Sequence, residues 1–480
     1  MLFFKHMIKN TAKFVGAILV GFLVNYSVVA QTINDEKIWS FKQTIATAQH
    51  NDPWLSGNKY QQQAKESLSR AAKTMPDPKM SIGIANLPTN GFDFSQEAMT
   101  QVKVGITQMF PRGDSLALHN QQLRIESEAY PLQRQDRKAK VAVTVGTLWL
   151  DAYQVQQSIS LIEQNRSLFE QLADVAQANY SSALGKTRQQ DIVRAQLELT
   201  RLDDRLDRLA QQQNAYLGQL SQWLSNAFSD YSDSVTLQEV SQLDAIKLQK
   251  KLPQLDLLAS ELVYSNTAIP VSVLAENFAM HPAVLAIDKK IAASKTGISL
   301  AEQQYQPEWG VNASYGYRDD DPVGNSRADF FSLGISFDLP LFNENRQDMT
   351  VKSAISNSEA IKTEKVLLLR QLLAAFSSAK ARLLRINKRK TLYQTKLLPQ
   401  IHDQAEAALT AYTNDDGDFA EVVRSRIAVL NAEIEQLKIL VEKQKLILSL
   451  NYLFVGSIAI TQTTISAKNS PQNLTPRGEK

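Results

Sequence analysis

The chain repeats a distinctive eight-residue pattern at a spacing of 229 residues. The segments VGITQMFP (residues 104–111) and LGISFDLP (residues 333–340) share an apolar residue, Gly-Ile, a small hydroxyl residue, two further residues, a bulky apolar residue and Pro. The same spacing separates Pro53 from Pro282 and Pro78 from Pro307. Solenoid repeats have periods of roughly 20 to 50 residues, so we interpret the chain as two copies of one half-molecule.

The first residues have the pattern of an export signal. Lys5, Lys9 and Lys13 precede the apolar run FVGAILVGFLV, and Val28 and Ala30 fit the small-residue rule of a cleavage site. We therefore predict a secretory signal peptide over residues 1–30. A membrane anchor is less favoured, because the apolar run is shorter than the roughly 20 residues of a spanning helix.

Charge and cysteine content exclude several classes of protein. The formal net charge is +3, and removal of residues 1–30 takes away three lysines and no acidic residue, which leaves zero. A neutral mature chain gives no electrostatic reason to expect a nucleic-acid partner. The absence of cysteine excludes disulfides, thiolate metal sites and a lipidated N-terminal Cys.

Four segments alternate apolar with polar or small residues, which is the period of a β-strand. They are KMSIGIANL, QVKVGITQMF, EWGVNASYGYR and FFSLGISFDLP. They form one strand pair over residues 79–110 and another over residues 308–341, so each half of the chain contributes one hairpin. The loops between the paired strands are rich in Gly, Pro, Asn and Asp, as turns require.

Most of the remaining sequence predicts long helices. The stretches from Ser115 to about Asn179 and from about Asn343 to Ala411 are rich in Ala, Leu, Gln and charged residues. About 65 helical residues span roughly 100 Å, with breaks or bends expected at Pro131 and Pro399. Such helices do not form a compact globule. A cytosolic coiled-coil rod would conflict with the export signal and with the two hairpins.

The hairpins point to a membrane barrel. Strands of about 9 to 11 alternating residues have the length of membrane-spanning strands, and only a closed barrel leaves no unpaired edge in lipid. Single-chain barrels begin at about eight strands, so four strands need other subunits to close. The alternative, a soluble sheet covered by helices, remains open. Pro111 and Pro340 are expected to mark strand ends.

The motifs together resemble the TolC-type outer membrane efflux factor family over nearly the whole mature chain. QTIATAQHNDPWL is similar to the family's opening helix, MPDPKMSIGIANLP and VGITQMFPRG to its first hairpin, and LGISFDLPLF to its strand exit. Tyr180 with DIV, and Tyr412 with EVV, resemble the family's motif at the tip of each helical hairpin, which is a Tyr, a turn and then an acid with two aliphatic residues. The hairpins are closest in style to members that serve heavy-metal or cation exporters of the resistance-nodulation-division class.

This resemblance implies a membrane α+β fold. It implies a homotrimer whose twelve strands form an outer membrane barrel, continued by a periplasmic α-helical coiled-coil barrel. It also implies a passive exit duct in a tripartite pump, with a periplasmic adaptor and an inner-membrane transporter as partners. We expect a first repeat over residues 31–260, with long helices to about residue 226, a second repeat over residues 261–460, and a flexible tail over residues 461–480.

The family's gate lies where the helices of each hairpin turn back, which here gives NYSSALGKTRQQDIVR and AYTNDDGDFAEVVRSR. The gate candidates are Tyr180, Asp191, Arg194, Tyr412, Asp415, Asp416, Asp418, Glu421 and Arg424. The candidate adaptor contacts are Leu184, Gly185 and Gly417. Repeated in a trimer, the acids would form a ring that favours cations, unless the arginines close it through salt bridges. Alternatively, these charges only cap and solvate the helical turns.

No catalytic signature competes with this interpretation. The chain lacks HExxH, GxSxG and a phosphate-binding Gly loop, and SSAK at residues 377–380 has SxxK spacing without companion motifs. His50, His119, His281 and His402 are scattered, so we expect no metal site, no cofactor and no enzyme. Two other functions stay open: an exit duct for an ATP-binding-cassette protein secretion system, and a periplasmic coiled-coil scaffold.

Overall fold

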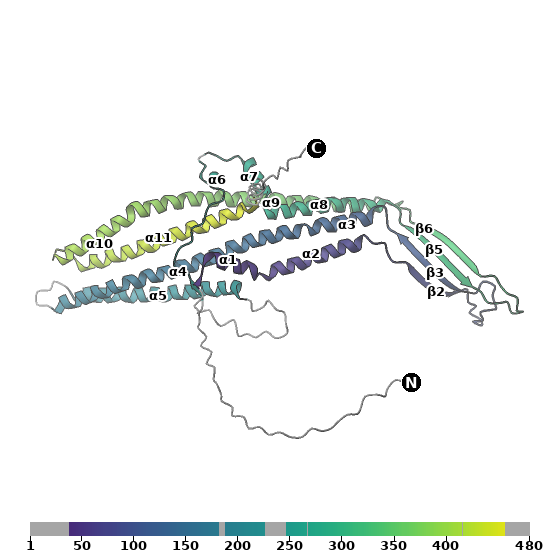
Figure 1. Ribbon diagram of the computed structural model, residues 1–480, viewed down its shortest axis with the longest axis horizontal. Helices are drawn as coiled ribbons and strands as arrows, with labels where there is room; N and C mark the ends of the chain where they lie inside the picture. The colour runs from purple at the N-terminus through teal and green to yellow at the C-terminus, as the bar shows by residue number, and fades with distance from the viewer. Residues whose placement is uncertain (1–37, 182–187, 226–245, 266, 415, 457–480) are drawn as a thin grey trace, which may run out of the picture.

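The computed structural model describes residues 38–181, 188–225, 246–265, 267–414 and 416–456. In these ranges a long helical body carries a four-stranded sheet at one end and the turns of two helical hairpins at the other (Figure 1). The helices are α1 (Phe41–His50), α2 (Pro53–Ala72), α3 (Ser115–Ser127), α4 (Ala129–Ser181), α5 (Gln189–Leu224), α6 (Ser260–Tyr264), α7 (Val271–Ala279), α8 (Pro282–Glu302), α9 (Gln347–Leu392), α10 (Leu398–Thr413) and α11 (Phe419–Leu453).

The strands are β1 (Ile38–Trp39), β2 (Lys79–Ala85), β3 (Gln101–Phe110), β4 (Lys247–Leu248), β5 (Trp309–Tyr317) and β6 (Phe330–Phe337). The four strands that the alternating patterns predict are present as β2, β3, β5 and β6. None of the described helices is both long enough and apolar enough to cross a membrane.

Helices α2 and α8 begin in the same way, 229 residues apart. Oδ1 of Asp52 accepts a hydrogen bond from the Trp54 N–H at 3.1 Å, and Nδ1 of His281 accepts one from the Ala283 N–H at 3.2 Å. A proline follows each cap at the first helical position, where the missing N–H costs nothing. These matching helix starts fit the duplication, which remains an inference from the sequence.

Both long helical stretches are interrupted beside a proline. The first breaks at Glu128, between α3 and α4, and Pro131 is the third residue of α4. The second widens into a π-turn over Tyr393–Leu397 just before Pro399 in α10. Proline lacks an N–H and clashes with the carbonyl four residues earlier, and a π-turn relieves such a clash. The breaks expected at the two prolines are therefore confirmed.

The helices nearest the sheet form a layer that continues the sheet. α2, α3, α8 and α9 contact one another in that order, and the strands follow the same order, β2-β3-β5-β6. Each strand connects directly to one helix of the layer (Figure 1). Towards the other end, α4 pairs with α5, the α9–α10 arm pairs with α11, and α11 also contacts α4.

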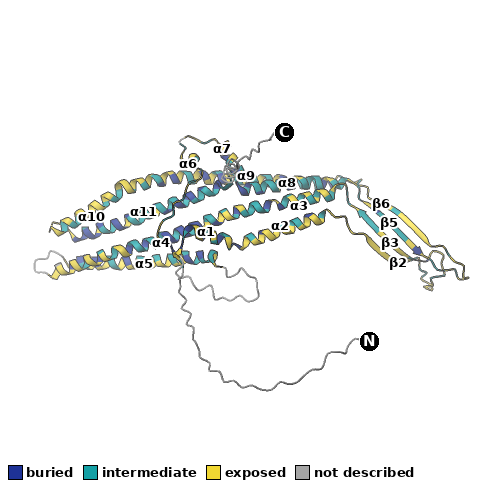
Figure 2. Cartoon of the chain, viewed as in Figure 1, coloured by how far each residue is buried: buried dark blue, intermediate teal, exposed yellow. Residues whose placement is uncertain are grey.

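Three hydrophobic clusters hold the body together along its length (Figure 2). One joins α7, α8, α9 and α11 around Phe278, Phe376 and Phe454. A central one surrounds Trp149, whose Nε1–H donates to the Trp39 carbonyl at 3.2 Å. This bond fixes the short parallel pair β1–β4 against α4. The third cluster lies between the two helical hairpins.

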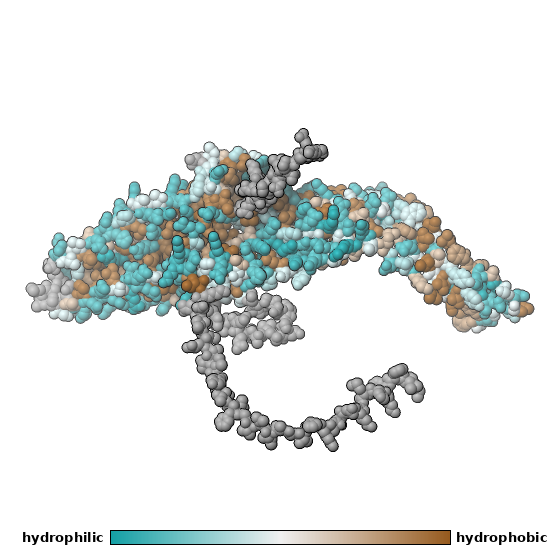
Figure 3. Space-filling view, viewed as in Figure 1, coloured by the Kyte–Doolittle hydropathy of each residue, from teal (hydrophilic) through white to brown (hydrophobic). Residues whose placement is uncertain are grey.

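The register of the sheet sorts its side chains onto two faces, because residues directly opposite in antiparallel strands share a face. One row consists of Ile82, Val104, Tyr315 and Phe331, and the neighbouring row of Ser81, Gly105, Ser314 and Ser332. The apolar face is open to the surroundings, with Ile82 70% and Leu333 68% exposed. Figure 3 shows the brown hydrophobic residues gathered over these strands.

Candidate channel gate

The predicted gate segments lie at the end of the molecule opposite the sheet (Figure 1). Tyr180 is the penultimate residue of α4, and Asp191 and Arg194 lie in the first turns of α5. Tyr412 is the penultimate residue of α10, and Glu421 and Arg424 lie in the first turns of α11. Leu184, Gly185 and Asp415 are outside the described residues. The structure thus brings both predicted turns to one end of the protein.

Tyr412 anchors the second turn to the core. Its ring contacts the ring of Phe419 with centroids 5.6 Å apart, and Phe419 is 2% exposed. Phe419 belongs to the cluster between the hairpins, which also contains Ala176 of α4 and Ala195 of α5. A movement of Tyr412 would therefore disturb the packing between the two hairpins.

The acidic residues of the second turn face solvent. Oδ1 of Asp418 caps α11 by accepting from the Ala420 N–H at 3.1 Å, yet the residue is exposed. Glu421 forms an ion pair with Arg424 one turn later, and both side chains are exposed, so salt screens this pair. Asp416 is exposed as well. Three carboxylates of the described residues therefore surround this turn, and one of them is partly neutralised.

Asp191 differs from its sequence counterpart Glu421, although both are the third helical residue. Asp191 is 5% exposed, and its Oδ2 accepts from the Arg188 N–H at 3.0 Å. The first turn has no acid at the cap position, so Asp191 supplies the capping oxygen there. In the second turn Asp418 caps the helix, which leaves Glu421 free to pair with Arg424. Arg194 and Tyr180 are exposed.

Gly417 is required by a close approach of the backbone. A Cβ atom at this position would lie 2.5 Å from the Tyr412 nitrogen and 2.7 Å from the Ala411 carbonyl carbon. No larger residue fits unless the end of α10 shifts. This gives Gly417 a structural role in the turn, and its contact with an adaptor stays a prediction.

Polar contacts between the hairpins and within the second hairpin were missed from the sequence. Arg205 of α5 donates to Oδ1 of Asn431 of α11 at 2.7 Å, and burial lowers the pKa of its guanidinium. Arg426 pairs with Glu406 at 2.9 Å and connects α11 to α10. No spacing pattern marks these residues, because their partners are set by helix packing and not by sequence distance.

The SxxK spacing has a structural explanation. Nζ of Lys380 donates to the carbonyls of Leu262 and Ser265, at 3.1 and 3.4 Å, at the end of α6. Ser377 donates its hydroxyl to the Leu373 carbonyl in its own helix. Both side chains are thus engaged with backbone groups. The described residues contain no group of three or more His, Asp or Glu side chains placed to hold a metal ion.

Comparison with known proteins gives a consistent result for the fold. No family model and no curated protein matches this chain. The Campylobacter jejuni CmeC outer membrane channel matches over 98% of this chain and 99% of its own, with a TM-score of 0.67 and 12% identity. VceC, an outer membrane protein of Vibrio cholerae, matches over 87% of this chain and 95% of its own, with a TM-score of 0.65 and 13% identity.

The Neisseria gonorrhoeae MtrE outer membrane channel, solved in an open state, matches over 87% of this chain and 88% of its own, with a TM-score of 0.64 and 12% identity. These structures are TolC-type outer membrane channels. This chain has the TolC-type channel fold. In this TolC-type fold, α4 and α10 end, and α5 and α11 begin, at one end of the helical body, and the sheet lies at the other (Figure 1).

Proposed function

We propose that this protein is an outer membrane exit duct of a tripartite efflux pump. Three copies, each contributing β2, β3, β5 and β6, would close a twelve-stranded barrel, and the helices would continue it across the periplasm. The two repeats, residues 31–260 and 261–460, would supply equivalent halves of each protomer after removal of the signal peptide. The duct is passive, and the partner transporter supplies the energy.

The apolar face of the sheet carries this proposal. At the end near the helices it has an aromatic row of Phe110, Trp309 and Phe337, and at the far end Tyr315, Tyr317 and Phe331. Between these rows the face is aliphatic except for Gln108, whose Nε2 donates to the Pro76 carbonyl at 2.8 Å. Trp309–Tyr317 has nine residues, within the roughly 9 to 11 residues of a tilted membrane-spanning strand. Outer membrane barrels show an apolar band of about 25 Å between two aromatic girdles.

The opposite face suits the wall of a water-filled duct. It carries serines, glycines and Asn312, and the charged residues Lys79 and Lys103 lie on it. The edge strands β2 and β6 have no outer partner among the described residues. An open edge cannot persist in lipid, so further strands from other copies would complete the sheet. A soluble scaffold would leave the exposed apolar face without a purpose.

The proposed partners are a periplasmic adaptor and an inner-membrane transporter of the resistance-nodulation-division class. Leu184, Gly185 and Gly417 are the proposed adaptor contacts at the tip. An ATP-binding-cassette secretion duct would share the fold and differ in the partner. Co-purification from cells after chemical crosslinking separates the two, because the inner-membrane protein recovered with the duct is of one class or the other.

We also propose that the tip turns gate the duct and set its ion selectivity at rest. The proposed gate residues are Tyr180, Asp191, Arg194, Tyr412, Asp415, Asp416, Asp418, Glu421 and Arg424. Repeated three times around a narrow opening, the exposed carboxylates would favour cations, and the Glu421–Arg424 pair would moderate their charge. Asp191 would contribute through the stability of its turn, because its carboxylate is occupied by capping.

Single-channel conductance in planar bilayers tests this function. The variant Asp416→Asn/Asp418→Asn/Glu421→Gln removes three charges, and Asn at residue 418 still caps the helix. We expect a small, cation-selective wild-type conductance and a clear loss of selectivity in the variant. Glu276→Gln in α7, an exposed acid remote from the tip, is the matched control. An inserted trimer that never conducts would refute the duct, and an unchanged variant would refute the gate alone.

A further inference from the structure

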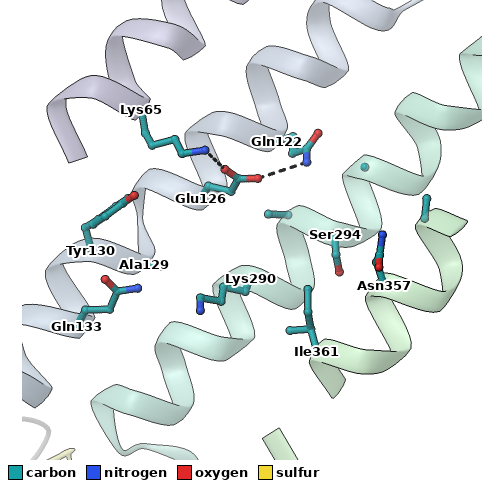
Figure 4. Close-up of a pocket in the computed structure, with 13 residues that line it drawn as sticks. Lys65, Gln122, Glu126, Ala129, Tyr130, Gln133, Lys290, Ser294, Asn357 and Ile361 are labelled. Atoms are coloured by element: carbon teal, nitrogen blue, oxygen red, sulfur yellow. Dashed lines mark hydrogen bonds and ion pairs between the residues drawn. The ribbon is translucent and has the colours of Figure 1, made fainter. Parts of the chain in front are cut away.

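A cavity of 480 Å³ opens between α2, α3, α4, α8 and α9 (Figure 4). Its volume is within the roughly 300 to 1,000 Å³ of small-molecule sites. Four small residues, Ala129, Ala293, Gly297 and Ala354, line it from three helices. At Gly297 a Cβ atom would lie 3.3 Å from Nε2 of Gln122. The cavity exists because no long side chain fills this space.

The charges that line the cavity do not cancel. Nζ of Lys65 lies 2.7 Å from Oε2 of Glu126, and this hydrogen bond raises the pKa of Lys65. Gln122 donates to the other oxygen of Glu126 at 3.3 Å. Lys290, an exposed residue of α8, lines the same space (Figure 4), and its ammonium group has no partner among the described residues. One cation is thus left unneutralised.

The cavity lies on the side of the layer that continues the polar face of the sheet. A second cavity, of 330 Å³, lies nearer the strands. Three residues that line the second cavity lie seven positions along the chain from residues that line the first, and a spacing of seven returns to the same helix face. In order from the first cavity to the second, the pairs are Gly297 and Gln304, Ala354 and Gln347, and Gln122 and Ser115. It also reaches Glu308, two residues before Gly310 of the polar sheet face.

We propose that the larger cavity binds an amphiphilic anion, a solute with one anionic group and a compact apolar body. Lys290 would hold the anionic group, and the small residues with Ile361 would contact the apolar body. The inference rests on the proposed function, because there this face is the duct wall that cargo passes. The carboxylates of the tip turns lie at the other end of the helical body. In the proposed function they set the selectivity of the resting duct for small ions, and they are not part of this cavity.

The chain has no cysteine, so a single thiol can report on the cavity of the full-length protein. Ala354→Cys would be modified with an anionic reagent, 2-sulfonatoethyl methanethiosulfonate, and with its cationic trimethylammonioethyl analogue. One nearby unpaired ammonium should favour the anionic reagent, and Lys290→Gln should lower the ratio of the two rates by about threefold to tenfold. Lys290→Arg should restore the ratio.

Lys289→Gln is the matched control. Lys289 is adjacent in sequence but pairs with Glu128 at 2.6 Å and does not line the cavity, so the ratio should not change. 1-Naphthalenesulfonate should slow modification of the thiol at residue 354. Methanesulfonate, which lacks the apolar body, and 1-naphthylmethylammonium, which has the opposite charge, should not. The proposal would be overturned if all three compounds protected the thiol equally, or if none of them protected it.

Conductance of the same cysteine variant in planar bilayers separates this proposal from the duct itself. A conducting trimer in which 1-naphthalenesulfonate gives no protection retains the duct and removes the binding site. Protection that depends on Lys290 in a trimer that never conducts retains the site and removes the duct.

Discussion

Tyr452, near the end of α11, donates its hydroxyl to Oδ1 of Asp136 in α4 at 2.8 Å. Asp136 also pairs with Lys140 at 2.7 Å and is 9% exposed. The ring of His281, the cap residue of α8, meets the Tyr452 ring edge-on with centroids 4.9 Å apart. Three helices from the two halves of the chain therefore meet at one polar cluster.

Removal of the Tyr452 hydroxyl should weaken this junction. In Tyr452→Phe the nearly buried Asp136 carboxylate loses one of its two partners, and we expect a loss of about 1 to 3 kcal/mol in the free energy of unfolding. Urea unfolding followed by far-ultraviolet circular dichroism measures it. Tyr60→Phe is the control, because Tyr60 is 69% exposed. Equal effects of the two substitutions would show that the hydrogen bond contributes nothing.

The same cluster should make stability depend on pH. Burial lowers the pKa of His281, against a smaller opposing effect of Asp136; the Tyr452 carbonyl and Lys140 also face the ring. The unfolded chain, with an ordinary pKa of about 6.5, then binds more protons than the folded chain below that pH. Stability should fall as pH drops below about 6.5 and level off below the folded pKa.

His281→Asn provides the measurement for this pH dependence. Asn can still cap α8 but does not titrate. The urea midpoint of the wild type should fall between about pH 7 and pH 5, and the variant should show a shallower dependence. Identical slopes in the two proteins would assign the pH dependence to other groups.

The architecture was predictable wherever one local rule decides. The alternation of strand residues has a period of two and needs no knowledge of partners, so all four strands of the sheet could be located. Pro131 and Pro399 break helices through their own covalent structure. The long helices followed from composition and spacing, and α9 begins at Gln347, four residues after the expected start at about Asn343.

The chemistry of the tip was less predictable, because it depends on which neighbour satisfies each group. Asp191 and Glu421 occupy equivalent motifs, yet the first is a buried cap and the second an exposed ion-pair partner. The difference follows from the cap position, which is Arg188 in α5 and Asp418 in α11. The contact of Arg205 with Asn431 depends on how the two hairpins pack, which no pattern in the sequence specifies.

The ends of the two hairpins should depend on Arg112. Its guanidinium pairs with Asp338 and donates to the Gln306 carbonyl at 2.7 Å, while Asp338 accepts from the Glu308 N–H at 2.7 Å. These bonds connect the exits of β3 and β6 across the start of β5. Arg112→Ala should therefore lower the yield of membrane-inserted, heat-resistant oligomer on gels, and Arg112→Lys should lower it less.

The control for Arg112→Ala is Arg385→Ala, because Arg385 is an exposed residue of α9 far from the strands.

The pKa of Asp338 is lowered, first by the Glu308 hydrogen bond and then by Arg112. A carboxyl group with a lowered pKa stabilises the fold above its unfolded pKa, and this stability is lost as pH falls through the folded pKa. Acid treatment should thus destabilise the proposed oligomer, and the Arg112→Ala variant should dissociate at a higher pH than the wild type. An unchanged dissociation pH would contradict the role of the pair.

Two glycine substitutions should have opposite effects. In Gly417→Ala the new Cβ would meet backbone atoms of Tyr412 and Ala411 at 2.5 and 2.7 Å, so the end of α10 must shift, at a cost of about 1 to 3 kcal/mol. Gly57 lies inside α2, and an added methyl group there would have no neighbouring atom within 4 Å, so Gly57→Ala should stabilise the protein by about 0.5 to 1 kcal/mol.

Urea unfolding measures the change in stability for both substitutions, and limited proteolysis should cut the Gly417→Ala tip faster than the wild-type tip. If Gly417→Ala is as stable as Gly57→Ala and its tip resists protease, the turn tolerates a side chain, and another reason for the glycine must be sought.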